Sequence, residues 1–177
     1  MSKSNHNQIQ HRTLWVTRTG VLIALLVVLQ WATSGLGQYV TGSCVNAVLA
    51  VATLTGGLQS GVTVALLSPF CAKLFGIGSQ LIQIVPAIAV GNLVFVVVLY
   101  FICKKQKIVG LVCGAVAKFG TLYLVVVQFI VPMLAENLKP QQIATFSTMF
   151  SSPQLITALI GGSVALAILP VLKKAMK

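Results

Sequence analysis

The stretch IVPAIAVGNLVFVVVLYFIC, residues 84–103, contains no charged side chain. A transmembrane helix needs about 20 consecutive, mainly apolar residues to cross the hydrocarbon core of a bilayer. The stretch is followed at once by KKQK (104–107), whose lysines would be costly to bury in lipid. It therefore predicts a membrane-spanning helix that ends at a charged turn.

The rest of the chain has a similar composition. Of its 177 residues, 57% are hydrophobic and only 7% are charged, and the mean hydropathy is +0.98. Soluble domains carry about 25% charged residues. A chain this apolar cannot cover a surface that faces water. We therefore expect an all-α integral membrane protein that crosses the cell membrane several times.

Six apolar runs predict six transmembrane helices in a single membrane domain, residues 14–172. The turn GGLQSG (56–61) should join the second and third runs into a helical hairpin. Residues 1–13 are expected to form a cytoplasmic tail, disordered or lying on the membrane surface, and residues 173–177 a basic cytoplasmic tail. The polar stretch 136–152 is expected to carry a short surface helix. The predicted spans are residues 14–32, 44–58, 62–75, 84–103, 108–131 and 153–172.

The positive charges indicate the orientation of these spans. The chain has 12 Lys and Arg against one acid, Glu136, which gives a net charge of +11. Cytoplasmic loops are enriched in Lys and Arg, and an even number of spans puts all three cationic clusters on one side. We therefore expect both ends in the cytoplasm (N-in and C-in) and a lipid bilayer, not a nucleic acid, as the partner of these charges. The clusters are Lys3, Arg12 and Arg18; Lys104, Lys105 and Lys107; and Lys173, Lys174 and Lys177.

The sequence argues against catalysis and metal binding. It contains no GxxxxGK[ST], HExxH or GxSxG motif. One carboxylate cannot supply paired acid and base groups. The four cysteines lack a CxxC spacing, and both histidines lie in the polar N-terminal segment. We therefore expect no catalytic residue, no metal site and no bound cofactor, and no ATP hydrolysis by this chain.

A few polar side chains lie within or beside the predicted spans. Lys118 lies in the middle of the fifth span, where an ionisable group costs about 3 kcal/mol on insertion scales and should face the protein interior or water. It could contact a ligand, or it could bond helix-end carbonyls or Asn92. Asn46, in the second span, is interpreted as structural. The candidate substrate-binding residues are Gln38, Tyr39, Asn92, Lys118, Tyr123 and Gln128.

Small residues recur at four-residue spacing, which places them on one helix face and allows close approach of another backbone. For most pairs we expect packing within the protein: Gly57/Gly61, Gly61/Ala65, Ala87/Gly91, Gly110/Gly114 and Ala158/Gly162. The pair Gly20/Ala24 differs, because its helix begins at the predicted cytoplasmic side and could present this flat face to a partner protein.

Several stretches resemble the substrate-binding S-components of energy-coupling factor (ECF) vitamin transporters. They are TRTGVLIALLVVLQ (17–30), GLGQYVTGS (35–43), LLSPFCAKLFGIG (66–78), VPAIAVGN (85–92) and AVAKFGTLYLVV (115–126). The likeness covers most of the chain and includes the six short spans with both ends inside. It is a likeness of pattern, since these proteins diverge widely.

The resemblance implies a mechanism and partners. An S-component captures a vitamin from outside with high affinity, and docks through its first helix on a transmembrane coupling subunit that carries two ATPase subunits. It then topples in the membrane and releases the vitamin inward. Gly20 and Ala24 would form the docking face, although the family motif is commonly AxxxA. The substrate would bind between the first, third and fifth connections and the outer halves of spans four to six.

The residues in the outer halves of the spans indicate which kind of vitamin could bind. The outer halves of the spans have no cluster of cations suited to folate and no acidic, Trp-rich environment suited to thiamine. Gly, Ser, Gln, Asn and Tyr suit a bulky, mostly neutral, amide-rich ligand. The chain most resembles the cobalamin-specific S-components, with pantothenate and riboflavin as alternatives. A self-sufficient secondary carrier is a more distant alternative, as is a structural or assembly protein of the membrane.

Overall fold

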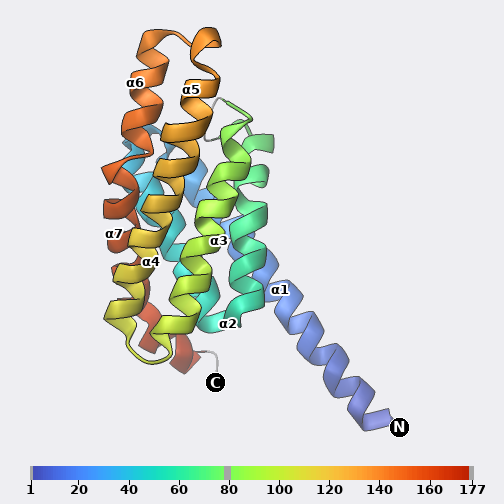
Figure 1. Ribbon diagram of the computed structural model, residues 1–177. Coiled ribbons are helices and arrows are strands. Elements are labelled where there is room, and N and C mark those ends of the chain that lie inside the picture. Colours follow the sequence, from blue (N-terminus) through green and yellow to red (C-terminus); the bar gives the residue numbers. More distant parts are fainter. Residues whose placement is uncertain (1, 78–80, 176–177) are drawn as a thin grey trace.

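The computed structural model describes residues 2–77 and 81–175, and within these ranges it contains helices and no strands (Figure 1). The connection between the predicted spans 62–75 and 84–103 lies outside these ranges at residues 78–80, and the predicted C-terminal tail lies outside them at residues 176–177. The elements are α1 (Ser2–Thr33), η1 (Ser34–Leu36), α2 (Gln38–Leu74), α3 (Ile84–Cys103), α4 (Lys107–Leu122), η2 (Tyr123–Ile130), α5 (Val131–Met133), η3 (Ala135–Asn137), α6 (Pro140–Met149) and α7 (Ser152–Ala175).

Five helical stretches of the described chain are long and apolar enough to cross a membrane. The prediction of an all-helical membrane protein is confirmed at this level. Helix α3 has the same bounds as the apolar stretch 84–103 from which the sequence analysis began. The five stretches are Arg12–Leu36, Gln38–Leu74, Ile84–Cys103, Lys107–Met133 and Pro140–Ala175.

Helix α2 is not a straight rod. Gly57 has φ 80° and ψ −176°, a non-helical conformation that favours glycine because it lacks a Cβ atom. A straight helix of this length would place its ends about 55 Å apart. Instead, Gln38 at the start of α2 and Phe75, which directly follows its last residue, line the same cavity. The chain therefore reverses at Gly57, within the turn predicted at residues 56–61.

The helices pack through small residues and two apolar clusters. The larger cluster joins α1, α2, α3, α4 and α7, and Phe95 and Leu49 are completely buried in it. A Cβ atom on Gly161 of α7 would lie 2.7 Å from the backbone nitrogen of Ala47 in α2. The second cluster joins α3, α4, η2, α5 and α6. Five pairs of small residues were predicted to pack internally, and in four of them both members are buried. In the fifth pair, Gly57/Gly61, Gly57 is partly exposed. The four buried pairs are Gly61/Ala65, Ala87/Gly91, Gly110/Gly114 and Ala158/Gly162.

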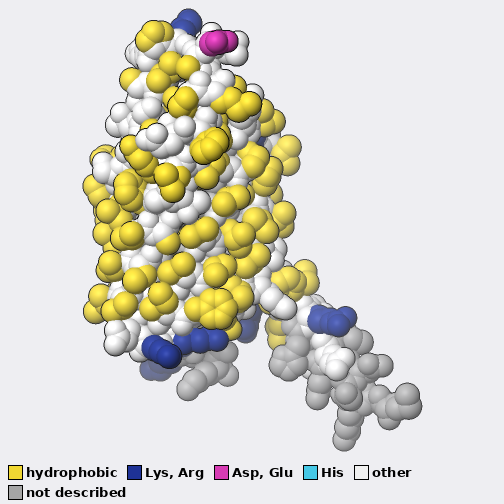
Figure 2. Space-filling view, in the orientation of Figure 1, with side chains coloured by type: hydrophobic (Ala, Val, Ile, Leu, Met, Phe, Trp, Pro, Cys, Tyr) yellow, Lys and Arg dark blue, Asp and Glu magenta, His cyan; other side chains and the backbone are white. Residues whose placement is uncertain are grey.

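The two ends of the bundle differ in charge. The α3–α4 turn, with its three lysines, and the C-terminal end of α7 lie at one end, which is basic in Figure 2. The connection between α5 and α6, which carries Glu136 and Lys139, lies at the opposite end (Figure 1). Between the two ends, apolar side chains cover the visible face, as a lipid-facing surface requires. Lys177, a member of the third predicted cationic cluster, is outside the described residues.

The N-terminal segment is helical where the structure describes it. Residues 1–13 were expected to be disordered or to lie on the membrane surface; the described part, residues 2–13, is not disordered but continues α1 as one helix, and its position on a membrane surface stays a prediction. This part extends away from the bundle (Figure 1). The physical reason is local, because no Gly or Pro interrupts residues 2–13 and helical hydrogen bonding can propagate from the apolar part of α1.

Two short elements complete the end of the bundle opposite the α3–α4 turn. The fifth apolar run changes at Tyr123 from an α-helix to the π-helix η2, which ends at Ile130. Helix α6 then folds back beside α5 and η2, with Phe146 buried in the second apolar cluster (Figure 1). The short helix predicted within residues 136–152 is therefore present, and it packs through an apolar side chain.

Candidate functional site

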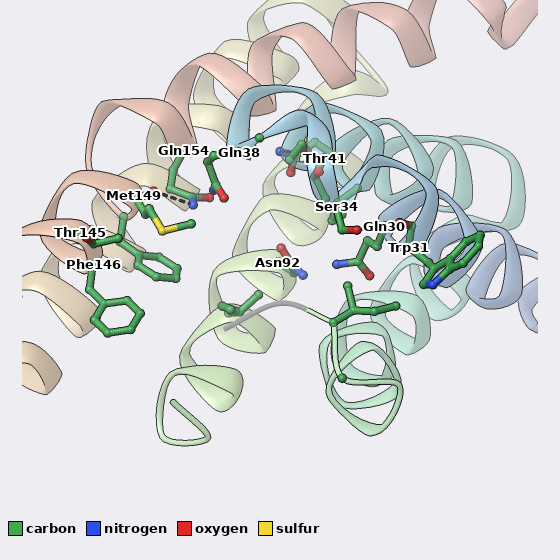
Figure 3. Close-up of a pocket in the computed structure, with 18 of the residues that line it drawn as sticks. Gln30, Trp31, Ser34, Gln38, Thr41, Asn92, Thr145, Phe146, Met149 and Gln154 are labelled. Atoms are coloured by element: carbon green, nitrogen blue, oxygen red, sulfur yellow. Dashed lines mark hydrogen bonds between the residues drawn. The ribbon is translucent and has the colours of Figure 1, made fainter. Parts of the chain in front are cut away.

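A cavity of about 990 Å³ lies at the end of the bundle opposite the α3–α4 turn. This volume is near the upper limit of about 1,000 Å³ for small-molecule pockets. The cavity is lined by segments far apart in the sequence: the end of α1, the start of α2, residues 75–77 after α2, the first half of α3, Lys118 of α4, α6 and the start of α7. Figure 3 shows Asn92 between Gln30 on one side and Met149 and Phe146 on the other.

The lining is rich in carboxamides. Amide groups both donate and accept hydrogen bonds, so they can bind other amides and hydroxyls. The apolar lining includes Trp31, Phe75, Phe146 and Phe150. The single acid of the chain, Glu136, is not part of the lining. The amide side chains are Gln30, Gln38, Asn46, Asn92, Gln141, Gln142 and Gln154, and the cations are Lys118 and Lys139.

Three of these lining residues form a buried polar cluster, which we call the Lys118 cluster: Lys118, Asn46 and Asn92. Lys118 is 3% exposed, and both asparagines are 1% exposed. The Nζ atom of Lys118 donates to Oδ1 of Asn46 at 2.6 Å and to Oδ1 of Asn92 at 2.7 Å. The cluster therefore joins α2, α3 and α4, and it accommodates the lysine that the sequence placed in the middle of the fifth span.

The Lys118 cluster continues into α7. Nδ2 of Asn46 donates to the carbonyl of Gly42 at 2.9 Å and to Oγ1 of Thr157 at 3.3 Å. Thr157 in turn donates to the carbonyl of Gln154 at 3.3 Å, and the Gln154 amide donates to the carbonyl of Met149 at 3.0 Å. A chain of hydrogen bonds thus connects the most buried part of the cavity to the α6–α7 connection.

The predicted substrate-binding residues separate into two groups. Gln38, Asn92 and Lys118 line the cavity. The bond between Lys118 and Asn92, which the sequence analysis gave as one alternative, is present. Asn46, interpreted as structural, also lines the cavity and is the second acceptor of Lys118.

The other three predicted residues lie outside the cavity lining. Tyr39 is 52% exposed. Tyr123 accepts a hydrogen bond from Gln128 at 3.1 Å, and this pair belongs to the exposed side of η2. The structure therefore brings these residues into no common site with Lys118.

The proposed docking residues are accessible. Gly20 and Ala24 are both exposed on α1, and a Cβ atom on Gly20 would meet no atom within 4 Å. The neighbouring Val21, at 60%, and Val28, at 59%, are also exposed. These four residues are therefore exposed on the surface of α1.

The sequence analysis missed several lining residues. Gln30 and Trp31 lie at the end of the first apolar run and were counted as part of the predicted span 14–32. The polar side chain of Gln30 within an apolar run was a signal that this end of the span faces a polar environment. The argument against thiamine counted no Trp-rich environment at the outer ends of the spans, yet Trp31 lines the cavity. Helix α6 contributes Phe146 and Thr145, which only the fold brings over the cavity.

Within residues 2–77 and 81–175, no three His, Cys, Asp or Glu side chains lie together in a way that could hold a metal ion. The chemistry of the lining is that of amides, hydroxyls, two ammonium groups and aromatic rings. Such a set can bind and orient a small molecule.

Comparison with known proteins identifies the family. The model of the family described as "ECF transporter, substrate-specific component" matches residues 15–173, which include nearly all the helical bundle and every residue that lines the cavity. Searches of the curated proteins and of the solved structures found no match. Members of this family are substrate-binding membrane subunits that associate with an ECF module of membrane and ATPase subunits. The chain belongs to the family of substrate-specific components of ECF transporters.

Proposed function

We propose that this chain is the high-affinity vitamin-binding subunit of an ECF-type ABC importer. The cavity carries the proposal: it is large, it lies at the end away from the basic turn, and its lining combines aromatic rings with amides. ATP hydrolysis is assigned to the two ATPase subunits of the module, bound to one transmembrane coupling subunit.

Cobalamin is the substrate that we propose first. It is bulky, and its corrin ring carries several amide side chains, which amide groups of the protein can pair with through mutual donation and acceptance. The volume of about 990 Å³ supports a bulky ligand better than a small one. Pantothenate and riboflavin are the alternatives.

The proposed contacts are Gln38, Asn92 and Lys118 from the sequence analysis, with Asn46 and Trp31 added from the cavity lining. Tyr39, Tyr123 and Gln128 remain predictions without support from this cavity.

Calorimetric titration of the purified chain in detergent tests the function. Cobalamin, pantothenate and riboflavin are each titrated into the protein. Tight binding of cobalamin supports the full proposal. Tight binding of one of the other two keeps the vitamin-binding function and replaces the substrate. Binding of none of the three would remove the proposed function.

We also propose six membrane crossings with both ends in the cytoplasm. The support is that α2 reverses at Gly57, so that its two arms can each cross, and that the lysine-rich α3–α4 turn lies opposite the cavity. In a chain without its four native cysteines, a membrane-impermeant maleimide should label Glu136→Cys on intact cells. Lys105→Cys should react only after lysis, and the reverse pattern would invert the orientation.

Gly20 and Ala24 are proposed as the docking face for the coupling subunit. The support is their exposure on α1 together with the open space around Gly20. Small residues let a partner helix approach closely, and dispersion contacts then replace contacts with lipid.

A further inference from the structure

The Lys118 cluster bears on the substrate itself. Lys118 is one of two cations in the cavity lining, and no carboxylate lines the cavity. The only acid in the sequence, Glu136, is exposed on η3. An ammonium group removed from water is stable only when it is paired with an opposite charge or fully hydrogen-bonded. Lys118 therefore lies beside the cavity without a carboxylate partner, and an anionic ligand would stabilise its charged form.

The hydrogen bonds of Lys118 leave part of its binding capacity unused. An ammonium group has three N–H donors. Two are accepted by the amide oxygens of Asn46 and Asn92, at 2.6 and 2.7 Å. The aromatic ring of Phe95 is also near, with its centroid 5.8 Å from Nζ of Lys118. These contacts hold the Nζ atom of Lys118 against α2 and α3, and one N–H donor remains beside the cavity.

Lys139 is the second basic side chain of the cavity lining, and it lies at a different depth from Lys118. It is exposed at the start of α6, where it also lines the cavity, whereas Lys118 is buried. A cleft lined by charge of one sign concentrates ligands of the opposite sign. The two lysines thus present positive charge both at the exposed edge of the cavity and at its most buried part.

From these observations we infer that the substrate carries an oxyanion, a carboxylate or a phosphate, that binds the Lys118 ammonium in the most buried part of the cavity. This inference rests on the proposed function and adds a constraint on the substrate. A carboxylate is present in pantothenate and a phosphodiester in cobalamin, whereas riboflavin has neither. The oxyanion would complete the set of three acceptors around Nζ, with the two asparagines orienting the lysine.

The experiment compares matched ligands on the unmodified chain in detergent. In each pair only one member carries the oxyanion: pantothenate and pantothenol, riboflavin phosphate and riboflavin, and cyanocobalamin and dicyanocobinamide, which also lacks the ribose and base of the nucleotide loop. In the pair that binds, the oxyanion-bearing member should bind about 10- to 100-fold more tightly, as expected for a hydrogen bond to a charged group out of water. Calorimetry gives both dissociation constants without any variant that could misfold.

Variants of Lys118 and Lys139 then test which lysine causes the preference for the oxyanion. Lys118→Gln should lower the preference for the oxyanion-bearing member about tenfold or more, and Lys118→Arg should restore part of the preference. Lys139→Gln is the matched control, because it removes an exposed charge from the same lining and should change affinity about fivefold or less. Size-exclusion chromatography and thermal unfolding verify that each variant is folded.

The outcomes separate the two proposals. If the neutral member of a pair binds as tightly as its partner, or riboflavin binds better than its phosphate, the oxyanion inference is overturned and the vitamin-binding function stands. If the preference exists but survives in Lys118→Gln, the assignment to Lys118 is overturned. If no member of any pair binds, the proposed function fails, and the inference fails with it.

Discussion

The close approach of α2 and α7 gives a prediction whose size follows from the structure. A Cβ atom on Gly161 would lie 2.7 Å from the backbone nitrogen of Ala47 and 2.8 Å from Cβ of Asn46, and closer still to the carbonyl oxygen of Ser43. Two of these three atoms belong to the backbone, so no rotamer change can relieve the overlap. In Gly161→Ala, the two helices must move apart.

Overpacking of this kind costs about 1–3 kcal/mol. The gain in helix propensity from glycine to alanine offsets about 1 kcal/mol of it. The net loss should therefore be about 0–2 kcal/mol, which lowers the Tm by up to roughly 8 °C for a chain of this size. Vitamin binding should weaken too, because Asn46 and Gln154 of the separated helices both line the cavity.

Thermal unfolding of the purified protein in one detergent measures the effect. The matched control is Gly120→Ala in α4, where a Cβ atom would meet nothing within 4 Å. This variant should keep or raise the Tm, since only the propensity changes. Equal Tm values for the two variants would show that the α2–α7 contact is not tight, and the reasoning would then be wrong.

Three further predictions concern the partner face, the Lys118 cluster and the cavity. Gly20→Trp or Ala24→Trp should abolish co-purification with the coupling and ATPase subunits and leave vitamin binding intact; complexes that survive both changes would remove the docking assignment. Asn46→Leu should lower the Tm by several degrees, because it removes the amide oxygen that accepts a 2.6 Å hydrogen bond from buried Lys118. The expected loss of stability is about 1.5–3 kcal/mol. An unchanged Tm would mean that this bond does not stabilise the fold. Trp31→Ala should weaken vitamin binding about three- to tenfold at unchanged Tm, since its ring is 69% exposed beside the cavity; calorimetry on wild type and variant decides it.

Much of the architecture could be predicted because lipid imposes a simple rule on sequence. An uncharged run of sufficient length must be helical in a membrane, and so residues 84–103 gave the bounds of α3 directly. The reversal at Gly57 was also predicted, because clustered glycines between apolar runs interrupt a helix. Continuation of α1 through residues 2–13 was missed, since polarity alone was taken to end the helix.

The site was predicted less completely, because apolar spans do not reveal which face points inward. Gln38 and Tyr39 are adjacent in sequence, but neighbours on a helix point about 100° apart. Gln38 consequently lines the cavity, whereas Tyr39 does not. Lys118 and Asn92 were found because a polar group at membrane depth is unusual by itself. The contribution of α6 depended on how the chain folds back, which no local pattern encodes.

The π-helix η2 has a consequence for chain length. A π-helical turn contains more residues than an α-helical turn of the same rise. The π-helical segment 123–130 therefore contains more residues than an α-helix would need to connect α4 with α5. Deleting one residue there can be absorbed by conversion to α-helix, with Lys118 on one side and α6 on the other left in register. The same deletion between residues 110 and 117 would rotate the lysine away from its asparagines. Insertions and deletions in this helix should therefore be confined to its π-helical segment.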